Sequence, residues 1–189
     1  MRACEDLNVQ RLSTLAAIEQ AIWHELDASV RTAEHGWRVA TLATLECGRA
    51  DARSVVLREV EPAARRVLFY TDARSPKVRH VEAHPEGTLL LWSRELGWQL
   101  RLAVTLEALT SGPAVTSRWA RLAATPAAQD YLSPLPPGSV IERPSSERGA
   151  QGHFALVVAS VSALDWTEIH PEGHRRAAFD AQGPRWLQP

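Results

Sequence analysis

The sequence is poor in cysteine and has no excess of positive charge, and each shortage removes a class of protein. Its two cysteines, Cys4 and Cys47, have neither a metal-type spacing nor the density of a disulfide scaffold, so we expect reduced thiols. The formal net charge is −1 at pH 7. That value argues against a general nucleic-acid binder, because such domains are usually strongly basic.

Long hydrophobic runs are also missing. The longest, FALVVASVSAL, is too short and too rich in serine to cross a bilayer. The first residues, MRACEDLNVQ, contain no apolar signal core, and no repeat of fixed period is visible. We therefore expect one cytoplasmic domain over residues 1–189, with neither a membrane nor a nucleic acid as its partner.

The N-terminal segment, residues 1–35, has the periodicity of a helix. Leu15, Ile18, Ile22, Leu26 and Val30 recur at steps of three and four residues and form one apolar stripe. Two shorter helices are predicted in SPKVRHVEAHP and GPAVTSRWARLAA. Residues 134–152 are rich in proline, glycine, serine and charge, which predicts a mobile loop.

Most of the remaining chain has the pattern of strands. WRVATLATLECGRADARSVVLREV predicts two strands around a turn at Gly48, and VLFYTD predicts a third. Further strands are expected in GTLLLWS, WQLRLAVTLEALT and HFALVVASVSALDWTEI. Several strands joined by short turns, with few helices, predict a mainly β (α+β) fold: a small antiparallel barrel with the N-terminal helix packed against it.

An anion site is predicted where the third strand meets the next helix. Ser75 suits the helix N-cap, Pro76 the first helical position, and Lys77 adds a positive charge beside the free N–H groups. Thr71 lies just upstream, and Arg53 on a neighbouring strand has a fork-shaped guanidinium that suits phosphate oxygens. The alternatives are a capped helix with a solvated lysine and a strand that carries arginines for solubility.

Three segments, RSVVLR, FYTDARSPK and GWQLRLAVTLEAL, resemble the flavin mononucleotide (FMN) motifs of the pyridoxamine 5′-phosphate oxidase family in their order and spacing. The resemblance runs from about Trp37 to Leu109 and resumes in DWTEI and HRRAAFDAQGPRWLQP. It implies a six-stranded-type antiparallel split barrel with short flanking helices, a homodimer, and FMN bound at the dimer interface.

The resemblance also implies roles for single residues. It places Arg53 and Lys77 on the FMN phosphate, and Arg58 next to flavin and substrate, where the family often has lysine. Gln99 would hydrogen-bond the flavin ring from the second subunit or a neighbouring strand. The other cofactor-binding positions that it implies are Ser75, Thr71 and Tyr70 near the phosphate, Ser54, Val55, Val56 and Leu57 along the isoalloxazine, and Trp166 at the family's C-terminal tryptophan.

The sequence departs from the family where the oxidase holds the phosphate of its substrate. Trp119, Ala123 and Ala127 replace a tyrosine, an arginine and a serine, and Ala178 replaces an arginine that contacts the flavin. The resemblance therefore implies a divergent branch, an FMN-dependent oxidoreductase acting on another small molecule, with Arg58 and Trp119 at the substrate pocket. The alternatives are a non-catalytic flavin-binding or sensing module, and a branch that binds haem or a deazaflavin.

One histidine pair has a spacing compatible with metal binding. His80 and His84 are four residues apart on the short helix, but the sequence offers no obvious third ligand. Histidines near a helix C-terminus also interact favourably with the helix dipole. We therefore expect no metal.

Overall fold

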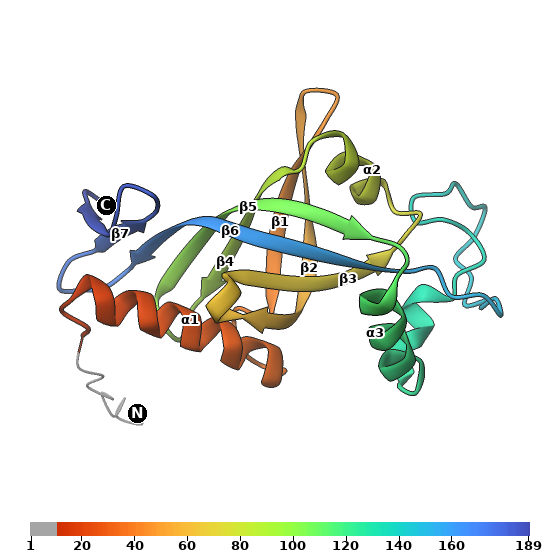
Figure 1. The fold of residues 1–189 in the computed structure, drawn as a ribbon, viewed down its shortest axis with the longest axis horizontal. Coiled ribbons are helices and arrows are strands. Elements are labelled where there is room, and N and C mark those ends of the chain that lie inside the picture. The colour runs from red at the N-terminus through yellow and green to blue at the C-terminus, as the bar shows by residue number, and fades with distance from the viewer. Residues whose placement is uncertain (1–10) are drawn as a thin grey trace.

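Eight strands and three α-helices form the regular structure of residues 11–189, the part of the chain that the computed structural model describes (Figure 1). Residues 1–10, with Cys4, lie outside the described residues. The helices are α1 (Leu15–Arg31), α2 (Pro76–Ala83) and α3 (Pro113–Ala123), with 3₁₀ turns η1 (Pro62–Ala64) and η2 (Pro126–Tyr131). The strands are β1 (Val39–Glu46), β2 (Arg49–Glu61), β3 (Arg66–Asp72), β4 (Glu86–Ser93), β5 (Trp98–Leu109), β6 (Phe154–Glu168), β7 (Arg175–Phe179) and β8 (Arg185–Leu187).

Six of the strands close into a ring. Their order is β3-β2-β1-β4-β5-β6, and β3 pairs with β6 to complete the circle. Strands β7 and β8 continue the sheet outward from β6. The predicted split barrel is therefore confirmed, whereas β7 and β8 were not predicted as strands.

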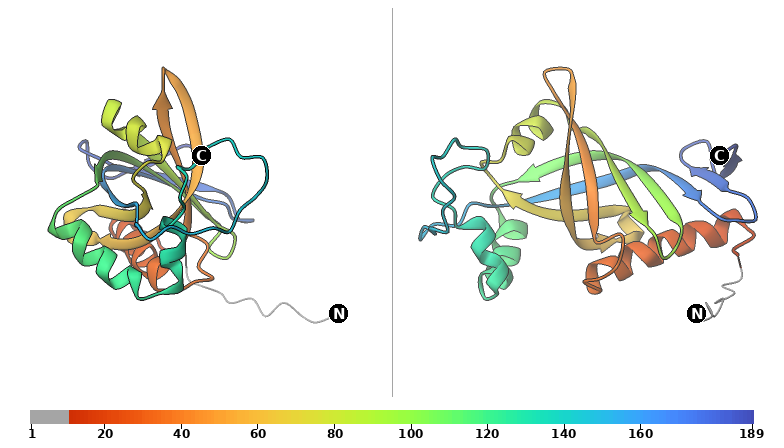
Figure 2. Two further views of the ribbon diagram at one scale, coloured as in Figure 1. Left: turned by 90° about the vertical axis from the view of Figure 1, so that its right-hand side faces the viewer. Right: turned by 180° about the vertical axis from the view of Figure 1, so that it is seen from behind.

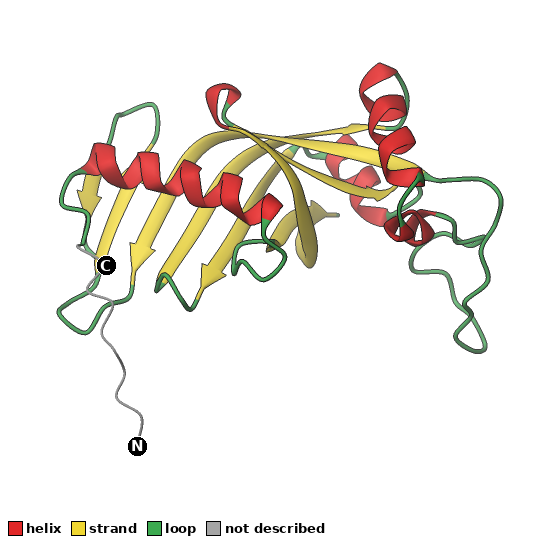
Figure 3. Cartoon of the chain, turned by 90° about the horizontal axis from the view of Figure 1, so that it is seen from below, coloured by secondary structure: helices red, strands yellow, loops and turns green. Residues whose placement is uncertain are grey.

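Helix α1 runs across the strands of the barrel (Figure 3). It begins where the Thr14 hydroxyl accepts a hydrogen bond from the Ala17 backbone N–H at 3.2 Å. Its predicted apolar stripe faces the barrel: Ile18, Ile22 and Leu26 are fully buried. They join the main core, so the helix covers an apolar surface that the strands alone would expose.

Alternation along the strands separates an inner from an outer face. On β4, Leu89 and Leu91 are buried, while Leu90 is 38% and Trp92 is 47% exposed. On the neighbouring β1, Val39 is 50% exposed. The barrel therefore has an apolar core and also carries apolar side chains on its outer face.

A second, smaller core lies outside the ring, where α3 and η2 pack on β3 and β6 (Figure 3). Its buried members are Leu68, Val115, Leu122, Tyr131, Phe154 and Leu156. The loop that was predicted over 134–152 follows η2 and contains neither helix nor strand. Within residues 11–189, no helix combines the length and the apolar character that crossing a membrane requires.

Strand β2 contains a β-bulge that the sequence pattern did not predict. Leu57 pairs with Phe69 and Glu59 pairs with Leu68, so Arg58 is an extra residue on β2. Cross-strand partners share a face, and Leu68 belongs to the outer core. The bulge therefore points Glu59 toward the outer core, whereas regular alternation from Leu57 would point it into the barrel.

Candidate functional site

The end of β3 and the start of α2 form a cluster of polar side chains. The Lys77 ammonium donates hydrogen bonds to Thr71 Oγ1 at 3.0 Å and to Ser75 Oγ at 2.7 Å. Both hydroxyl residues are buried. Ser75 occupies the N-cap position, but its hydroxyl accepts from Lys77 and makes no hydrogen bond to the helix backbone. Thr71, Ser75 and Lys77, predicted to lie together, do so.

The environment of Lys77 disfavours its charged form. Burial, and then the nearby positive charge of Arg53, lower the pKa of the Lys77 ammonium, while Asp72 and Asp51 act in the opposite direction. The two hydrogen bonds to buried hydroxyls, and a side chain that is only partly exposed, distinguish Lys77 from a freely solvated lysine.

Arg53 is held by contacts that the sequence did not reveal. Its Nη1 donates to Thr44 Oγ1 at 2.6 Å and to the Leu42 carbonyl at 3.4 Å, and its guanidinium forms an ion pair with Asp51. Thr44 and Leu42 lie on β1, which pairs with β2. In the free protein, Arg53 is therefore partly neutralised by a carboxylate on its own strand.

The four residues of β2 that were predicted to lie along the isoalloxazine are divided between the two faces of the strand. Val55 and Leu57 are 7% and 0% exposed and belong to the main core, whereas Ser54 and Val56 lie on the other face of the strand. The prediction was that these four residues line the isoalloxazine through backbone and side chain, and for Val55 and Leu57 the side-chain part conflicts with burial in the core. Those two can present only backbone atoms outside the core.

Arg58, at the bulge, lies against the outer core. Its guanidinium carbon is 5.9 Å from the centroid of the Tyr70 ring, a cation–π contact. Burial raises the pKa of the nearby Tyr131 hydroxyl, and the charge of Arg58 opposes that rise. Within residues 11–189, no carboxylate oxygen lies within 4.0 Å of an Arg58 nitrogen. Arg53 and Arg58 thus have different surroundings, Arg53 beside Thr44 and Arg58 beside Tyr70.

A three-residue network borders Arg58. Glu59 accepts hydrogen bonds from the Tyr70 hydroxyl at 2.6 Å and from Arg118 Nε and Nη2, each at 2.7 Å. Burial raises the pKa of Glu59, but the hydrogen bonds from Arg118 and Tyr70 outweigh it and leave that pKa below its ordinary value. Burial and the Glu59 carboxylate raise the pKa of Tyr70 to about 12. Strand alternation alone does not predict this network, because the bulge creates it.

Aromatic rings surround Trp119, the residue that stands where the resemblance expects a tyrosine of the oxidase's substrate site. The Trp119 ring lies 6.3 Å from Tyr131 and 5.7 Å from Phe154, centroid to centroid. A Cβ atom at Gly152 would lie 2.5 Å from the Trp119 ring, so the loop backbone approaches this ring closely. Ala127 packs beside this cluster, and Ala123 is exposed on α3.

The remaining predicted residues lie elsewhere on the sheet. Gln99 is the second residue of β5 and pairs with Trp92 on β4 and Thr167 on β6. Trp166 is fully buried, with its ring edge-on to Trp98 at 5.3 Å, so its side chain cannot contact a flavin at the surface of this chain. Ala178 lies directly opposite Arg185 in the β7–β8 ladder.

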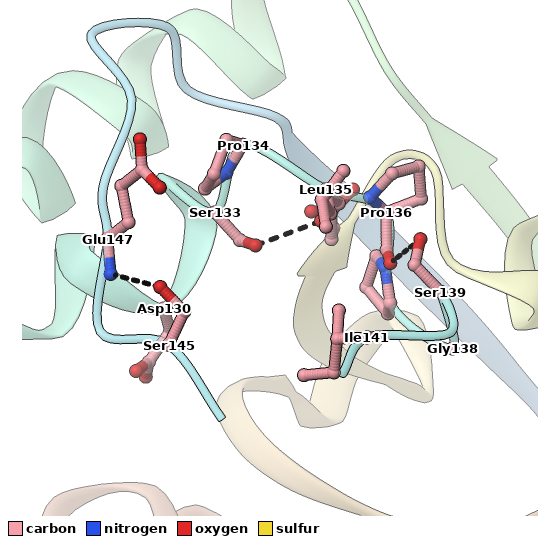
Figure 4. Close-up of a pocket in the computed structure, with 12 residues that line it drawn as sticks. Asp130, Ser133, Pro134, Leu135, Pro136, Gly138, Ser139, Ile141, Ser145 and Glu147 are labelled. Carbon is pink, nitrogen blue, oxygen red and sulfur yellow. Dashed lines mark hydrogen bonds between the residues drawn. The ribbon is translucent and has the colours of Figure 1, made fainter. Parts of the chain in front are cut away.

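A pocket of about 450 Å³ opens within the loop that follows η2 (Figure 4). The loop supplies most of its walls, including Pro134, Leu135 and Ile141, and Asp72 lies at its edge. Arg74 anchors the loop, since its Nη2 donates to Asp72 Oδ2 at 2.7 Å and to the Ser133 carbonyl at 2.8 Å. The pocket adjoins the end of β3 but contains neither Arg53 nor Lys77.

The network predicts late ionisation of Tyr70. Tyr131→Phe leaves Tyr70 as the sole tyrosine of the chain, and its absorbance titration should have a midpoint near pH 12 rather than at the ordinary 10.0. Glu59→Gln should lower that midpoint, because it removes the neighbouring negative charge. The folded-state pKa is the higher one, so the contribution of Tyr70 to stability is complete below about pH 10 and is lost as the pH rises toward 12.

The same protein in denaturant is the control for this titration and should ionise near pH 10. A native midpoint near 10 would show that the Tyr70–Glu59 hydrogen bond is absent in solution.

Comparison with known proteins connects this geometry to one family. The family described as "Pyridoxamine 5′-phosphate oxidase, FMN-binding domain" matches residues 16–110. The pyridoxine/pyridoxamine 5′-phosphate oxidase of Granulibacter bethesdensis is 31% identical over 167 residues, which cover 78% of this chain and 78% of that protein.

Two crystal structures share the fold. One is a pyridoxamine 5′-phosphate oxidase-related, FMN-binding protein from Nostoc punctiforme, with a TM-score of 0.73 and 23% identity, covering 90% of this chain and 96% of that one. The other is PhzG from Burkholderia lata in complex with tetrahydrophenazine-1-carboxylic acid, with a TM-score of 0.71 and 16% identity, covering 100% and 98%. Together with the matched sequence, the split barrel and its cationic cluster place this chain in the pyridoxamine 5′-phosphate oxidase-like family of FMN-binding domains.

Proposed function

We propose that this chain is an FMN-binding oxidoreductase that acts on a small molecule other than pyridoxamine 5′-phosphate. The observation that carries the proposal is the cluster at the start of α2, where Lys77 and Arg53 interact beside the hydroxyls of Thr71 and Ser75. FMN carries a phosphate dianion, and no other part of the flavin needs such a cluster.

The cluster fits a phosphate group in charge and in donor geometry. A helix N-terminus favours an anion through its free N–H groups and its dipole. Lys77 is partly desolvated and repelled by Arg53, so a dianion between them would remove an unfavourable interaction. Arg53 can exchange its contact with Asp51 for the phosphate, because both are anionic oxygen acceptors.

The flavin ring would lie along the outer face of β2. Ser54 and Val56 are on this face, and Arg58 follows them at the bulge. Bound FMN supplies the ability to accept and return a hydride. The residues of the chain would orient the ring, and Arg58 would place a positive charge beside it.

The substrate would lie against the aromatic cluster around Trp119. Tyr131 and Phe154 offer ring faces and edges rather than charged groups, and they suit a planar molecule. Arg58 lacks a carboxylate partner in the described chain, so it could bind one anionic group of the substrate. No charged side chain for a substrate phosphate is present at Trp119, Ala123 or Ala127.

The chain would act as a homodimer with FMN at the interface. The outer face of β1 and β4 exposes Val39, Leu90 and Trp92, which association would cover. Gln99 pairs with Trp92 across the β4–β5 ladder, so it belongs to the same region of the sheet. This position allows Gln99 to reach the flavin held by the partner subunit.

Phosphate recognition predicts different responses to FMN and to riboflavin. Arg53→Ala and Lys77→Ala should each weaken FMN binding by a factor of roughly ten to a hundred, since a hydrogen bond to a charged group contributes about 1.5–3 kcal/mol. The double variant should lose less FMN binding free energy than the sum of the two single losses, because both residues bind one phosphate. Fluorescence titration of each flavin gives the two affinities.

Riboflavin is the control ligand, because it lacks the phosphate and its binding should hardly change in these variants. Arg58→Ala is the matched control variant: it should alter flavin reduction or turnover more than FMN affinity. If both phosphate-site variants fold and bind FMN as tightly as the wild type, the proposed phosphate site does not exist.

A Soret band in place of flavin absorption in the purified protein would identify haem as the cofactor. Tight FMN binding without turnover of any substrate would indicate a sensing module.

The altered substrate positions predict weak or absent oxidation of pyridoxamine 5′-phosphate. Ala123→Arg restores a guanidinium at an exposed site on α3, where the fold should tolerate it. That change should raise kcat/KM for this compound, by up to about a hundredfold if the new contact forms fully. A dedicated oxidase of the family serves as the reference. Wild-type rates equal to that reference would show that the substrate is pyridoxamine 5′-phosphate after all.

The apolar outer face predicts the assembly state. Light scattering should give twice the chain mass of 20.9 kDa. Trp92→Glu should shift the protein toward monomer, because it places a charge in the proposed interface. Val140→Glu is the control, since Val140 is 99% exposed in the loop and should leave the dimer intact. A stable wild-type monomer that binds FMN tightly would contradict the shared site.

A further inference from the structure

Three side chains capable of binding a metal meet at the tip of the β1–β2 hairpin. They are Glu46, Asp51 and His80, and their ligand atoms all lie within 4.8 Å of one another. Figure 2 shows α2, which carries His80, beside the projecting hairpin. The histidine pair that the sequence suggested is a different group: His80 is buried, whereas His84 is exposed and follows the last residue of α2.

The two ring nitrogens of His80 have different surroundings. The side chain is only 5% exposed, and Nδ1 lies 3.3 Å from Thr44 Oγ1, 3.4 Å from Arg53 Nη2 and 3.6 Å from Asp51 Oδ2. Asp51 therefore has to turn from the Nδ1 side to share an ion with Nε2 and Glu46. Nε2 is buried without a hydrogen-bond partner in the described chain, although Glu46 Oε1 lies 3.2 Å away. When Nδ1–H donates to Thr44, Nε2 keeps its lone pair and faces the Glu46 carboxylate. A metal-bound histidine has this arrangement, with its second nitrogen fixed by an oxygen acceptor.

The two carboxylates are free to adjust. The side chains of Glu46 and Asp51 are 54% and 44% exposed, and both line a hollow of about 510 Å³ at the hairpin. The hollow is lined by hairpin residues and does not include His80, so these two carboxylates form the solvent-facing side of the cluster. Asp51 also pairs with Arg53, but Arg53 keeps Thr44 Oγ1 and the Leu42 carbonyl as acceptors if Asp51 turns toward an ion.

We propose that Glu46, Asp51 and His80 form a binding site for a divalent transition-metal ion of the Zn²⁺ type. One imidazole nitrogen and two carboxylate oxygens, with water in the fourth position, are a donor set that suits Zn²⁺. Mg²⁺ and Ca²⁺ prefer oxygen ligands alone, so the nitrogen of His80 selects against them. The competing interpretation is that a protonated His80 pairs with the two carboxylates. In that case the three side chains would not bind Zn²⁺.

Calorimetric titration of tag-free protein with Zn²⁺ tests the site. Every protein carries Cys4→Ser and Cys47→Ser, so that a thiolate cannot account for binding. We expect one Zn²⁺ per chain and no comparable binding of Mg²⁺. His80→Ala, and separately the pair Glu46→Gln and Asp51→Asn, should weaken Zn²⁺ binding by at least about tenfold.

The matched controls are His84→Ala and His174→Ala, which remove exposed histidines and should leave Zn²⁺ affinity unchanged. Circular dichroism shows whether His80→Ala folds. If it does not, the carboxylate pair decides the question, because both of its side chains are substantially exposed. The proposal is overturned if the starting protein does not bind Zn²⁺ at about 10 μM, or if the folded site variants bind it as well as that protein. Neither result bears on the FMN and riboflavin titrations, which are made without metal.

Discussion

The pairing of β3 with β6 is the constraint on which both the cationic cluster around Lys77 and the aromatic cluster around Phe154 depend. Its register runs from Arg66 opposite Ser160 to Asp72 opposite Phe154, and it closes the six-stranded ring. Because side chains alternate along a strand, successive residues of β3 face different surroundings. Thr71 contacts Lys77 at the start of α2, while Tyr70 packs against Phe154 in the outer core. Strand β3 thus supplies Thr71 to the cluster around Lys77 and the preceding residue, Tyr70, to the aromatic cluster around Phe154.

The bulge on β2 adds a second constraint on the same region. It turns Glu59 toward Arg118 and Tyr70, and it leaves Arg58 beside the Tyr70 ring. Without the extra residue, Glu59 would be buried in the barrel without a partner, at a cost of several kcal/mol. The polar network and the position of Arg58 therefore have one structural origin.

Local signals in the sequence were sufficient to predict those parts of the candidate site whose residues are close together in the chain. Serine, proline and lysine in succession marked the start of α2, and Thr71 is only six residues from Lys77. Strand alternation and the helical stripe likewise predicted the barrel and α1. Contacts between strands were beyond this reasoning: Thr44 on β1 meets Arg53 on β2 only because the two strands pair in one register.

The same limit explains where the resemblance and the burial of the residues disagree. The resemblance assigned Trp166 to the cofactor, and Val55 and Leu57 to it through backbone and side chain, but burial in the main core depends on which face of the sheet is enclosed. A motif aligned by sequence does not carry that information. Strands β7 and β8 were not predicted because they are only five and three residues long. A segment of that length is too short to show the alternation of apolar and polar residues that marks a strand.

The two cations of the proposed phosphate site are not equivalent, and their partners show why. Asp72 is occupied by Arg74, and Asp51 by Arg53, so within the described chain Lys77 contacts only hydroxyl groups. A phosphate can bind Lys77 without breaking an ion pair, whereas it can bind Arg53 fully only by displacing Asp51. The carboxylate keeps the free protein from burying two adjacent uncompensated cations, and it lowers the gain from the second contact. The affinity of the site is therefore set by the balance between Asp51 and the phosphate for one guanidinium.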